Sequence, residues 1–282
     1  VSQPTISRLL RKQDYSLKRN RKEKESKAKH PERDKQFRYI KAQRAEYVEA
    51  KIPTVSIDCK KKELIGDFKN QGESWCQKAA QVNVHDFPSE GMGRAVPYGI
   101  YDVNENRGYV SVGKSYDTAE FAVESLRDWW LSEGQLNYPE AKAVALLLDG
   151  GGSNSCRSKL WKKQIQERLC DELGLEVIIH HYPRGCSKWN PIEHRLFSQI
   201  SVNWAGQPLR SFETMIAYIN GTRTTTGLTV KASLNDKTYT KGQKVSDAEM
   251  SGLNIEFHDI CPKWNYTIRP RGDHVKSISK ER

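Results

Sequence analysis

Apolar residues recur in residues 1–12 with the i, i+3, i+4 spacing that predicts a short helix. The stripe consists of Ile6, Leu9 and Leu10. The opposite face is polar and basic, as in the recognition helix that a helix-turn-helix domain inserts into the DNA major groove. We therefore expect this helix to contact DNA through Arg8, Arg11 and Lys12.

The pattern then changes twice before the first strand. Residues 18–30, KRNRKEKESKAKH, have no apolar periodicity, which predicts a linker. A helical pattern returns from Pro31 to about Ala50, with an apolar face formed by Phe37, Ile40, Tyr47 and Val48. We expect residues 1–30 to be a helix-turn-helix remnant with a basic linker, and a folded domain to begin at residue 31.

Four strands are predicted next. The β-branched run IPTVSIDCK ends near Asp58, and ELIGDFKN is interpreted as its neighbour in the sheet. VPYGIYDV and GYVSVGK follow, joined by a turn at residues 104–108. Residues 70–95 are interpreted as a long polar excursion between the second and third strands, and the four strands as an antiparallel meander.

Helices and strands alternate after the meander. Asp117-Thr118-Ala119-Glu120 has the spacing of a capping box and predicts a helix to about residue 132. KAVALLLD is apolar throughout, which is typical of a strand buried on both faces, and it ends at Asp149 before the turn GGGSN. A helix over residues 155–173, the strand EVIIHHYP, and helices over 190–204 and 211–222 complete this part.

The order of elements predicts an α/β fold with a mixed sheet flanked by helices. We assign residues 31–227 to this domain. Residues 228–282 contain period-2 patches and a capping box at Ser246-Asp247-Ala248-Glu249, and we expect them to form a C-terminal extension packed on the domain.

Composition and charge restrict the function. With 37% hydrophobic and 29% charged residues, no visible signal peptide and no apolar run that could cross a bilayer, the chain is expected to be cytoplasmic and without a membrane partner. The net charge is +11, and residues 1–50 hold 15 Lys and Arg against 7 Asp and Glu. This concentration favours a nucleic-acid partner, with a solvated basic linker as the alternative.

Cysteine and histidine spacing gives little support for a zinc site. None of the six cysteines forms a CxxC pair, so we expect reduced packing residues. A cluster of His180, His181, Cys186 and His194 is conceivable, but its spacing fits no common metal site.

Three acids are the candidate catalytic residues. Asp58 and Asp149 end strands that we expect to be neighbours, and Glu193 lies in the first turn of the helix that follows EVIIHHYP. Sites gather at strand ends in α/β sheets, and three adjacent carboxylates repel one another unless a divalent cation lies between them. The pattern therefore indicates a site for Mg²⁺, with two ions as the arrangement for attack on a phosphodiester.

Each acid also has a structural interpretation. Asp58 could be a turn residue at a strand end, Asp149 could stabilise the glycine turn, and Glu193 could be the third residue of a box capped by Asn190. Against this, Phe197 follows Glu193 on one helix face, together with Ile200 and Trp204, so the carboxylate is expected near the core.

Long segments of the chain carry a family resemblance. They are SIDCKKKELIGDFKN, VHDFPSEGMGRAVPYGIYDV, GYVSVGKSYDTAEFAVESLRDWW, LLLDGGGSNSCRSKLWK, YPRGCSKWNPIEHRLFS and DICPKWNYTI. These segments closely resemble the Rhodopirellula-type DDE transposases of bacterial insertion sequences, which have an RNase H-like catalytic fold. The likeness extends from Ser2 nearly to Ile268.

The resemblance implies that Asp58, Asp149 and Glu193 are the catalytic and metal-binding acids. It implies cleavage and strand transfer at the ends of an element with Mg²⁺ or Mn²⁺, element ends and target DNA as partners, and a possible homodimer in a synaptic complex. It also implies a bacterial cytoplasmic location, at the nucleoid when DNA is bound. The helix-turn-helix departs from the family, since only its last helix is recognised. We therefore expect an N-terminally truncated protein that does not transpose autonomously; the alternative is a non-catalytic DNA-binding product of a decayed element.

Other residues have weaker assignments. Lys60 is a candidate phosphate contact or a solvated strand end, and Trp189 is a candidate for base stacking or core packing. His194 could assist proton transfer or contact DNA, with a structural or exposed role as the alternative. His85-Asp86 is interpreted as a structural turn, with Asp86 as a further acid near the site as the alternative.

Overall fold

The computed structural model describes residues 2–16 and 30–272, and the chain divides into two compact units, Val1–Pro31 and Glu32–Arg282. In the first unit, helix α1 (Gln3–Lys12) forms where apolar spacing predicted it, with Arg11 and Lys12 in its last turn. A helix-turn-helix is not confirmed by this one helix. The predicted linker, apart from His30, lies outside the described residues.

The second unit is built on one mixed sheet. Its described strands lie in the order β7-β4-β3-β1-β5-β6-β9-β8, with β2 paired to β3 at the side. Pairing is parallel between β1 and β5, β5 and β6, and β4 and β7, and antiparallel elsewhere. The strands are β1 (Thr54–Cys59), β2 (Glu63–Ile65), β3 (Gly93–Asp102), β4 (Arg107–Gly113), β5 (Ala143–Asp149), β6 (Glu176–Tyr182), β7 (Thr229–Asn235), β8 (Ile255–Phe257) and β9 (Asn265–Ile268).

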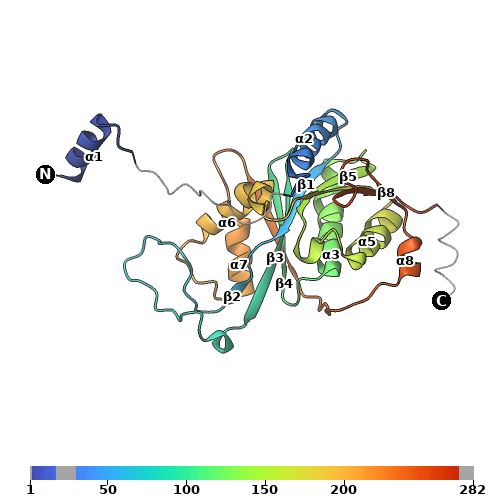
Figure 1. Cartoon of the computed structure of the whole chain (residues 1–282). Coiled ribbons are helices and arrows are strands. Elements are labelled where there is room, and N and C mark those ends of the chain that lie inside the picture. The colour runs from blue at the N-terminus through green and yellow to red at the C-terminus, as the bar shows by residue number, and fades with distance from the viewer. Residues whose placement is uncertain (1, 17–29, 273–282) are drawn as a thin grey trace. The chain divides into compact units, whose positions relative to one another are not determined.

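Helices cover both faces of this sheet (Figure 1). The α-helices are α2 (Arg33–Glu49), α3 (Ala119–Trp129), α4 (Gln135–Asn137), α5 (Lys159–Ile165), α6 (Ser198–Asn203), α7 (Phe212–Asn220) and α8 (Asp247–Ser251). Three helices contain π-turns, at η2 (Trp130–Gly134), η4 (Gln166–Asp171) and η6 (Glu193–Phe197). Short 3₁₀ turns are η1 (Pro88–Glu90), η3 (Gly152–Asn154) and η5 (Ser187–Trp189). No helix in residues 2–16 or 30–272 combines the length and apolar character needed to cross a bilayer.

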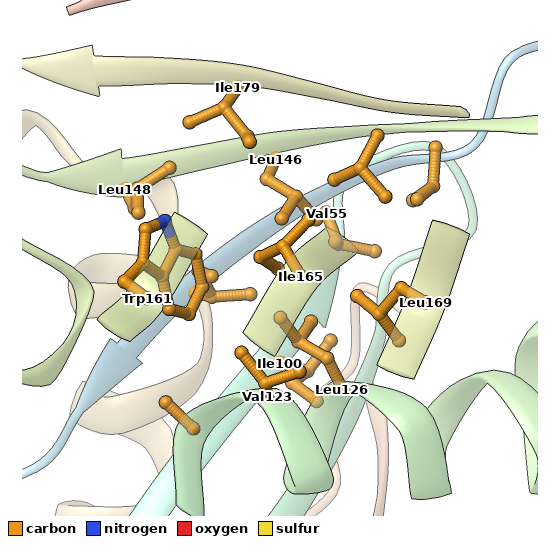
Figure 2. Close-up of a cluster of buried hydrophobic side chains, with 14 of the residues drawn as sticks. Val55, Ile100, Val123, Leu126, Leu146, Leu148, Trp161, Ile165, Leu169 and Ile179 are labelled. Atoms are coloured by element: carbon orange, nitrogen blue, oxygen red, sulfur yellow. The ribbon is translucent and has the colours of Figure 1, made fainter. Parts of the chain in front are cut away.

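The core is divided between the two faces of the sheet, as the side chains of β5 show. Successive side chains of a strand point to opposite faces. Leu146 and its neighbours at i±2 pack against α3 and α5 (Figure 2), whereas Leu147 lies against Ile40 of α2 on the other face. Both residues are fully buried, so the prediction of a strand covered on both sides is confirmed.

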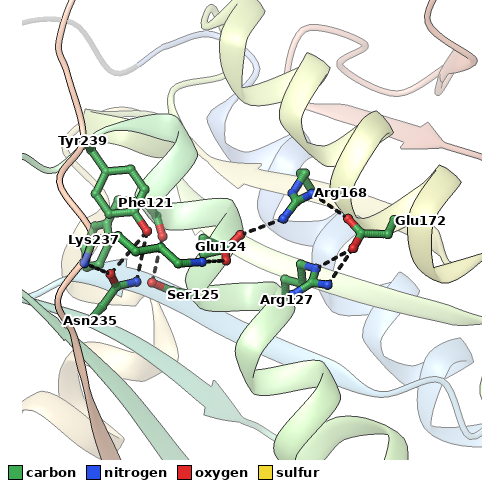
Figure 3. A network of polar contacts seen from close by, with 9 residues as sticks. All are labelled: Phe121, Glu124, Ser125, Arg127, Arg168, Glu172, Asn235, Lys237 and Tyr239. Atoms are coloured by element: carbon green, nitrogen blue, oxygen red, sulfur yellow. Dashed lines mark hydrogen bonds and ion pairs between the residues drawn. The ribbon is translucent and has the colours of Figure 1, made fainter. Parts of the chain in front are cut away.

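A polar network ties the segment after β7 to α3 (Figure 3). Glu124 on α3 pairs with Lys237 and with Arg168, whose Nη2 lies 3.4 Å from Glu124 Oε2. Although burial acts to raise it, these two cations hold the pKa of Glu124 below its usual value. Residues 228–272 therefore contribute to the fold: β7 and β9 also supply strands beside β4 and β6.

Several local predictions are wrong. ELIGDFKN does not neighbour β1, since β2 pairs with β3 and the neighbours of β1 are β3 and β5. Asp117 does not cap α3: Thr118 Oγ1 accepts from Phe121 N instead. Val48 is 61% exposed and lies off the buried face of α2.

Other boundaries are shifted or confirmed. The helix expected from residue 155 begins at Lys159, because Ser158 provides its cap. The capping box at Ser246 is confirmed, with both reciprocal hydrogen bonds to Glu249.

Replacing Leu146 by Ala tests the core that supports the site. We expect the free energy of unfolding to fall by about 2–5 kcal/mol, because the fully buried side chain leaves a cavity between β5 and the helices. Urea unfolding measures the change. Val202→Ala is the matched control, since Val202 is 71% exposed and its truncation should change stability by less than about 0.5 kcal/mol. Equal losses in the two variants would contradict this account of the core.

Candidate active site

The register of two parallel strands places Asp58 beside Asp149. The β1–β5 ladder runs from Thr54↔Ala145 to Ile57↔Leu148, and these acids occupy the next position on each strand. Residues at equal register on adjacent strands point to the same face. Both carboxylates thus lie at the same edge of the sheet, on the face opposite α3 and α5.

Backbone groups orient the two aspartates. Cys59 N donates to Asp58 Oδ1 at 2.7 Å, and Gly151 N donates to Asp149 Oδ1 at 3.1 Å. The glycine turn after Asp149 is itself held, because Tyr98 Oη donates to Asn154 Oδ1 at 2.9 Å in the interior. Asp149 therefore stabilises the turn, as its structural interpretation predicted.

The helix that carries Glu193 packs on strands that have glycine at the contact points. A Cβ at Gly99 would lie 2.4 Å from Phe197 Cε1, and one at Gly108 would lie 2.4 Å from Leu196 Cδ1. Only glycine permits this close approach. Phe197, with Ile200 and Trp204 further along, is buried as the apolar spacing predicted.

The start of this helix differs from the prediction. Asn190 was expected to cap it, but its side chain turns to β1. Asn190 Oδ1 accepts from Ser56 Oγ at 2.5 Å, and Nδ2 donates to Ile57 O at 3.1 Å. Ser56 Oγ in turn accepts from Ile192 N at 3.0 Å and so provides the cap from another element.

The acids act on one another electrostatically. Burial, together with the charges of Asp149 and Glu193, raises the pKa of Asp58 to about 8, against the lowering effect of the Cys59 N–H. Burial also raises the pKa of Glu193, with a further contribution from Asp149, whereas the charges of His194 and Lys60 act to lower it. These partly buried, mutually repelling oxygen donors are the type that Mg²⁺ and Mn²⁺ favour.

The three acids influence one another's charge without surrounding a single point. Within residues 2–16 and 30–272, no three His, Cys, Asp or Glu side chains are grouped closely enough to hold a metal ion between them. The structure thus brings Asp58 and Asp149 side by side and couples Glu193 to both electrostatically, without a closed three-ligand cage.

The remaining candidates are placed as follows. Lys60 is internal: its Nζ lies 3.0 Å from Glu63 Oε1 and 4.8 Å from the centre of the Trp204 ring. Trp189 is 53% exposed and meets Phe37 edge-on. Arg8, with Arg11 and Lys12, is exposed on α1 in the other unit.

The metal-binding cluster of three histidines and Cys186 considered from the sequence does not form. His180 bonds to Tyr47 Oη at 2.7 Å and His181 to Tyr266 Oη at 3.0 Å. Burial lowers the pKa of His180 to about 4 and that of His181 to about 3, so both rings are neutral. His194 is exposed, with Nε2 at 2.5 Å from Lys188 O, and Asp86 is an exposed loop residue.

Two residues near the site were missed. Asp117 adds to the charge that raises the pKa of Asp58 and of Cys59, and its Oδ1 is buried without a hydrogen-bond partner among the described residues. The sequence pattern had suggested a helix cap there. Ser56, two residues before Asp58, carried no chemical signal of its own in the sequence.

The raised pKa of Asp58 predicts an unusual dependence of stability on pH. Between the unfolded value near 4 and the folded value of about 8, the native state binds one more proton than the unfolded state, so stability falls as pH rises. The slope for one proton is at most about 1.4 kcal/mol per pH unit. We expect Asp58→Asn to flatten this fall between pH 5 and pH 8, as measured by urea unfolding in the presence of a chelator. Asp86→Asn is the control and should retain the slope of the wild type; a flat wild-type profile would contradict the prediction.

Solved structures with the same fold are Mos1 transposase complexes. A paired-end complex with the left transposon end matches 78% of this chain and 62% of its own, at 17% identity and a TM-score of 0.50. Mos1 mariner paired-end complexes with Mn and with Mg match 78% of this chain and 63% of theirs, at 18% and 16% identity and TM-scores of 0.50 and 0.52. The chain thus has the RNase H-like fold and spans about three-fifths of the length of the Mos1 chains.

No curated protein sequence matches the chain. The family model described as "Rhodopirellula transposase DDE domain" matches residues 1–270, which is almost the whole sequence. The elements that carry Asp58, Asp149 and Glu193 all lie within the matched region. The chain is therefore a member of the Rhodopirellula DDE transposase family.

Proposed function

We propose that this protein catalyses metal-dependent phosphoryl transfer on DNA, cutting at the ends of an insertion sequence and joining them to a target. The observation that carries the proposal is the side-by-side position of Asp58 and Asp149 at the end of the β1–β5 ladder, with Glu193 near enough to raise the pKa of Asp58. Membership of the family supports the reaction class.

Asp58 and Asp149 are proposed to hold Mg²⁺ or Mn²⁺, with Glu193 completing the set for a second ion. When bound, such ions activate water or a 3′-hydroxyl and stabilise the leaving oxygen of a phosphodiester. The chain itself provides position: the N–H groups of Cys59 and Gly151 hold one oxygen of each aspartate and leave the other for a ligand. No side chain here is proposed as a covalent nucleophile.

DNA is the proposed partner, both as element ends and as target. The Mos1 structures are described as paired-end and strand-transfer complexes, and we propose that two copies of this chain likewise hold two ends. We also propose that α1 contacts DNA through Arg8, Arg11 and Lys12, and that Trp189, exposed beside η6, stacks on a base. An intracellular location, where the protein meets DNA, is part of the same proposal.

Asp149→Asn tests the catalytic assignment. Purified protein is incubated with DNA that carries the element ends, with Mg²⁺, with Mn²⁺ or with chelator, and strand cuts are read on a denaturing gel. We expect metal-dependent cuts that fall at least about a thousandfold in Asp149→Asn, because loss of one ligand removes the stabilisation of charge in the transition state. Asp86→Asn, an exposed acid, should cut like the wild type. Binding without cuts under every metal condition would instead favour a non-catalytic DNA-binding product.

Salt dependence tests the assignment of α1. Each phosphate contact contributes about −0.9 to the slope of log affinity against log salt. Arg8→Gln and Arg11→Gln together should therefore make the slope shallower by nearly two and weaken binding at low salt, as measured by fluorescence anisotropy. Lys41 is an exposed residue of α2, so Lys41→Gln is the control for the loss of one positive charge outside α1. A slope that does not change in the double variant would remove α1 from the interface.

A further inference from the structure

We propose that Ser56 and Asn190 are positioning residues that fix the distance between the first and third acids and thereby set the affinity for metal. The inference rests on the proposed function and deepens it. Ser56 precedes Asp58 by two residues on β1, and Asn190 precedes Glu193 by three. A contact between them therefore connects two acids that lie far apart along the chain.

The contact is a closed set of neutral hydrogen bonds. Ser56 Oγ donates to Asn190 Oδ1 and accepts from Ile192 N, while Asn190 Nδ2 donates to Ile57 O. Ser56, Asn190 and Ile192 are all 0% exposed. We refer to Ser56, Asn190 and the Ile192 N–H as the clamp. Because water does not reach these groups, breaking one bond leaves a buried partner unsatisfied, which keeps the arrangement fixed.

The clamp lies where the helix is least regular. The hydrogen-bonding pattern widens to a π-turn at Glu193, directly after Ile192, and π-turns often mark functional sites. The Ile192 N–H is taken by β1 and not by a side chain of its own helix. The start of the helix is thus held at a fixed position on β1, the strand of Asp58. Glu193 follows one residue after Ile192.

The clamp holds the start of the helix close to a pair of carboxylates. Asp58 and Asp149 lie side by side at the strand ends, and Ile192, whose N–H is bound by Ser56, is followed directly by Glu193. A neutral clamp adds no charge of its own to the site. Groups that orient ligands without touching the metal change its affinity by about 10- to 100-fold when removed.

The experiment measures Mn²⁺ alone binding to the full chain, by calorimetry, in three variants. Ser56→Ala removes one oxygen atom, and Asn190→Leu removes the amide while filling much of the same space. Ser125→Ala is the matched control: its hydroxyl is also 0% exposed and donates to Phe121 O at 2.8 Å, but it lies within α3. Amide hydrogen exchange of residues 190–197 is followed in the same samples.

We expect Ser56→Ala and Asn190→Leu to bind Mn²⁺ about tenfold more weakly or worse, and to exchange faster at residues 190–197 only. Ser125→Ala should match the wild type in both measurements, even if it loses similar stability. Affinities within twofold of the wild type in the clamp variants would overturn the inference and leave the proposed function standing. A wild-type protein that takes up no Mn²⁺ would overturn both together.

Discussion

The constraint on which the site depends is the register of β1 against β5. Pairing of Thr54 with Ala145 sets every later pair, and the ladder brings Asp58 and Asp149 together at its end. A shift by one residue would send one acid to the opposite face. Val55, Ile57 and alternate apolar residues of β5 pack against α3 and α5, and a shift would remove the residues of the moved strand from this packing. The core therefore holds two like charges in a position that they would not adopt alone.

The interior next to these acids does not neutralise them. His180 and His181 are uncharged, and the His181 ring accepts or donates only to the Asp149 carbonyl and Tyr266. His194 and Lys60 act to lower the pKa of Glu193, and the Lys60 ammonium is also paired with Glu63. The hydrogen bonds of Ser56 and Asn190 provide position without adding a positive charge that would compete with a cationic ligand for the carboxylates.

The sequence alone predicted the layers of the fold well, because the spacing of apolar residues depends only on neighbouring positions along the chain. The apolar run KAVALLLD and the β-branched run before Asp58 predicted strands that exist. Asp58 and Asp149 were chosen by their place at strand ends, and Glu193 by its place in the first turn of a helix. Pairings that depend on distant segments were less accessible: β2 pairs with β3, Thr118 replaces Asp117 as a cap, and Ser56 caps a helix 136 residues away. A hydroxyl in a strand has the same local pattern whether or not a helix start reaches it.

The pairing of β1 with β3 connects the first acid to the helix that carries the third. Asp58 pairs with Gly99, and directly paired residues of antiparallel strands point to one face. The space that Gly99 leaves beside Asp58 is filled by the Phe197 ring, four residues after Glu193. A larger residue at 99 would push the helix away from the aspartate edge, whereas a smaller one at 197 would leave it unsupported. The separation of the first and third acids thus depends on Gly99. Because Gly99 has no reactive side chain, a search for reactive residues does not find it.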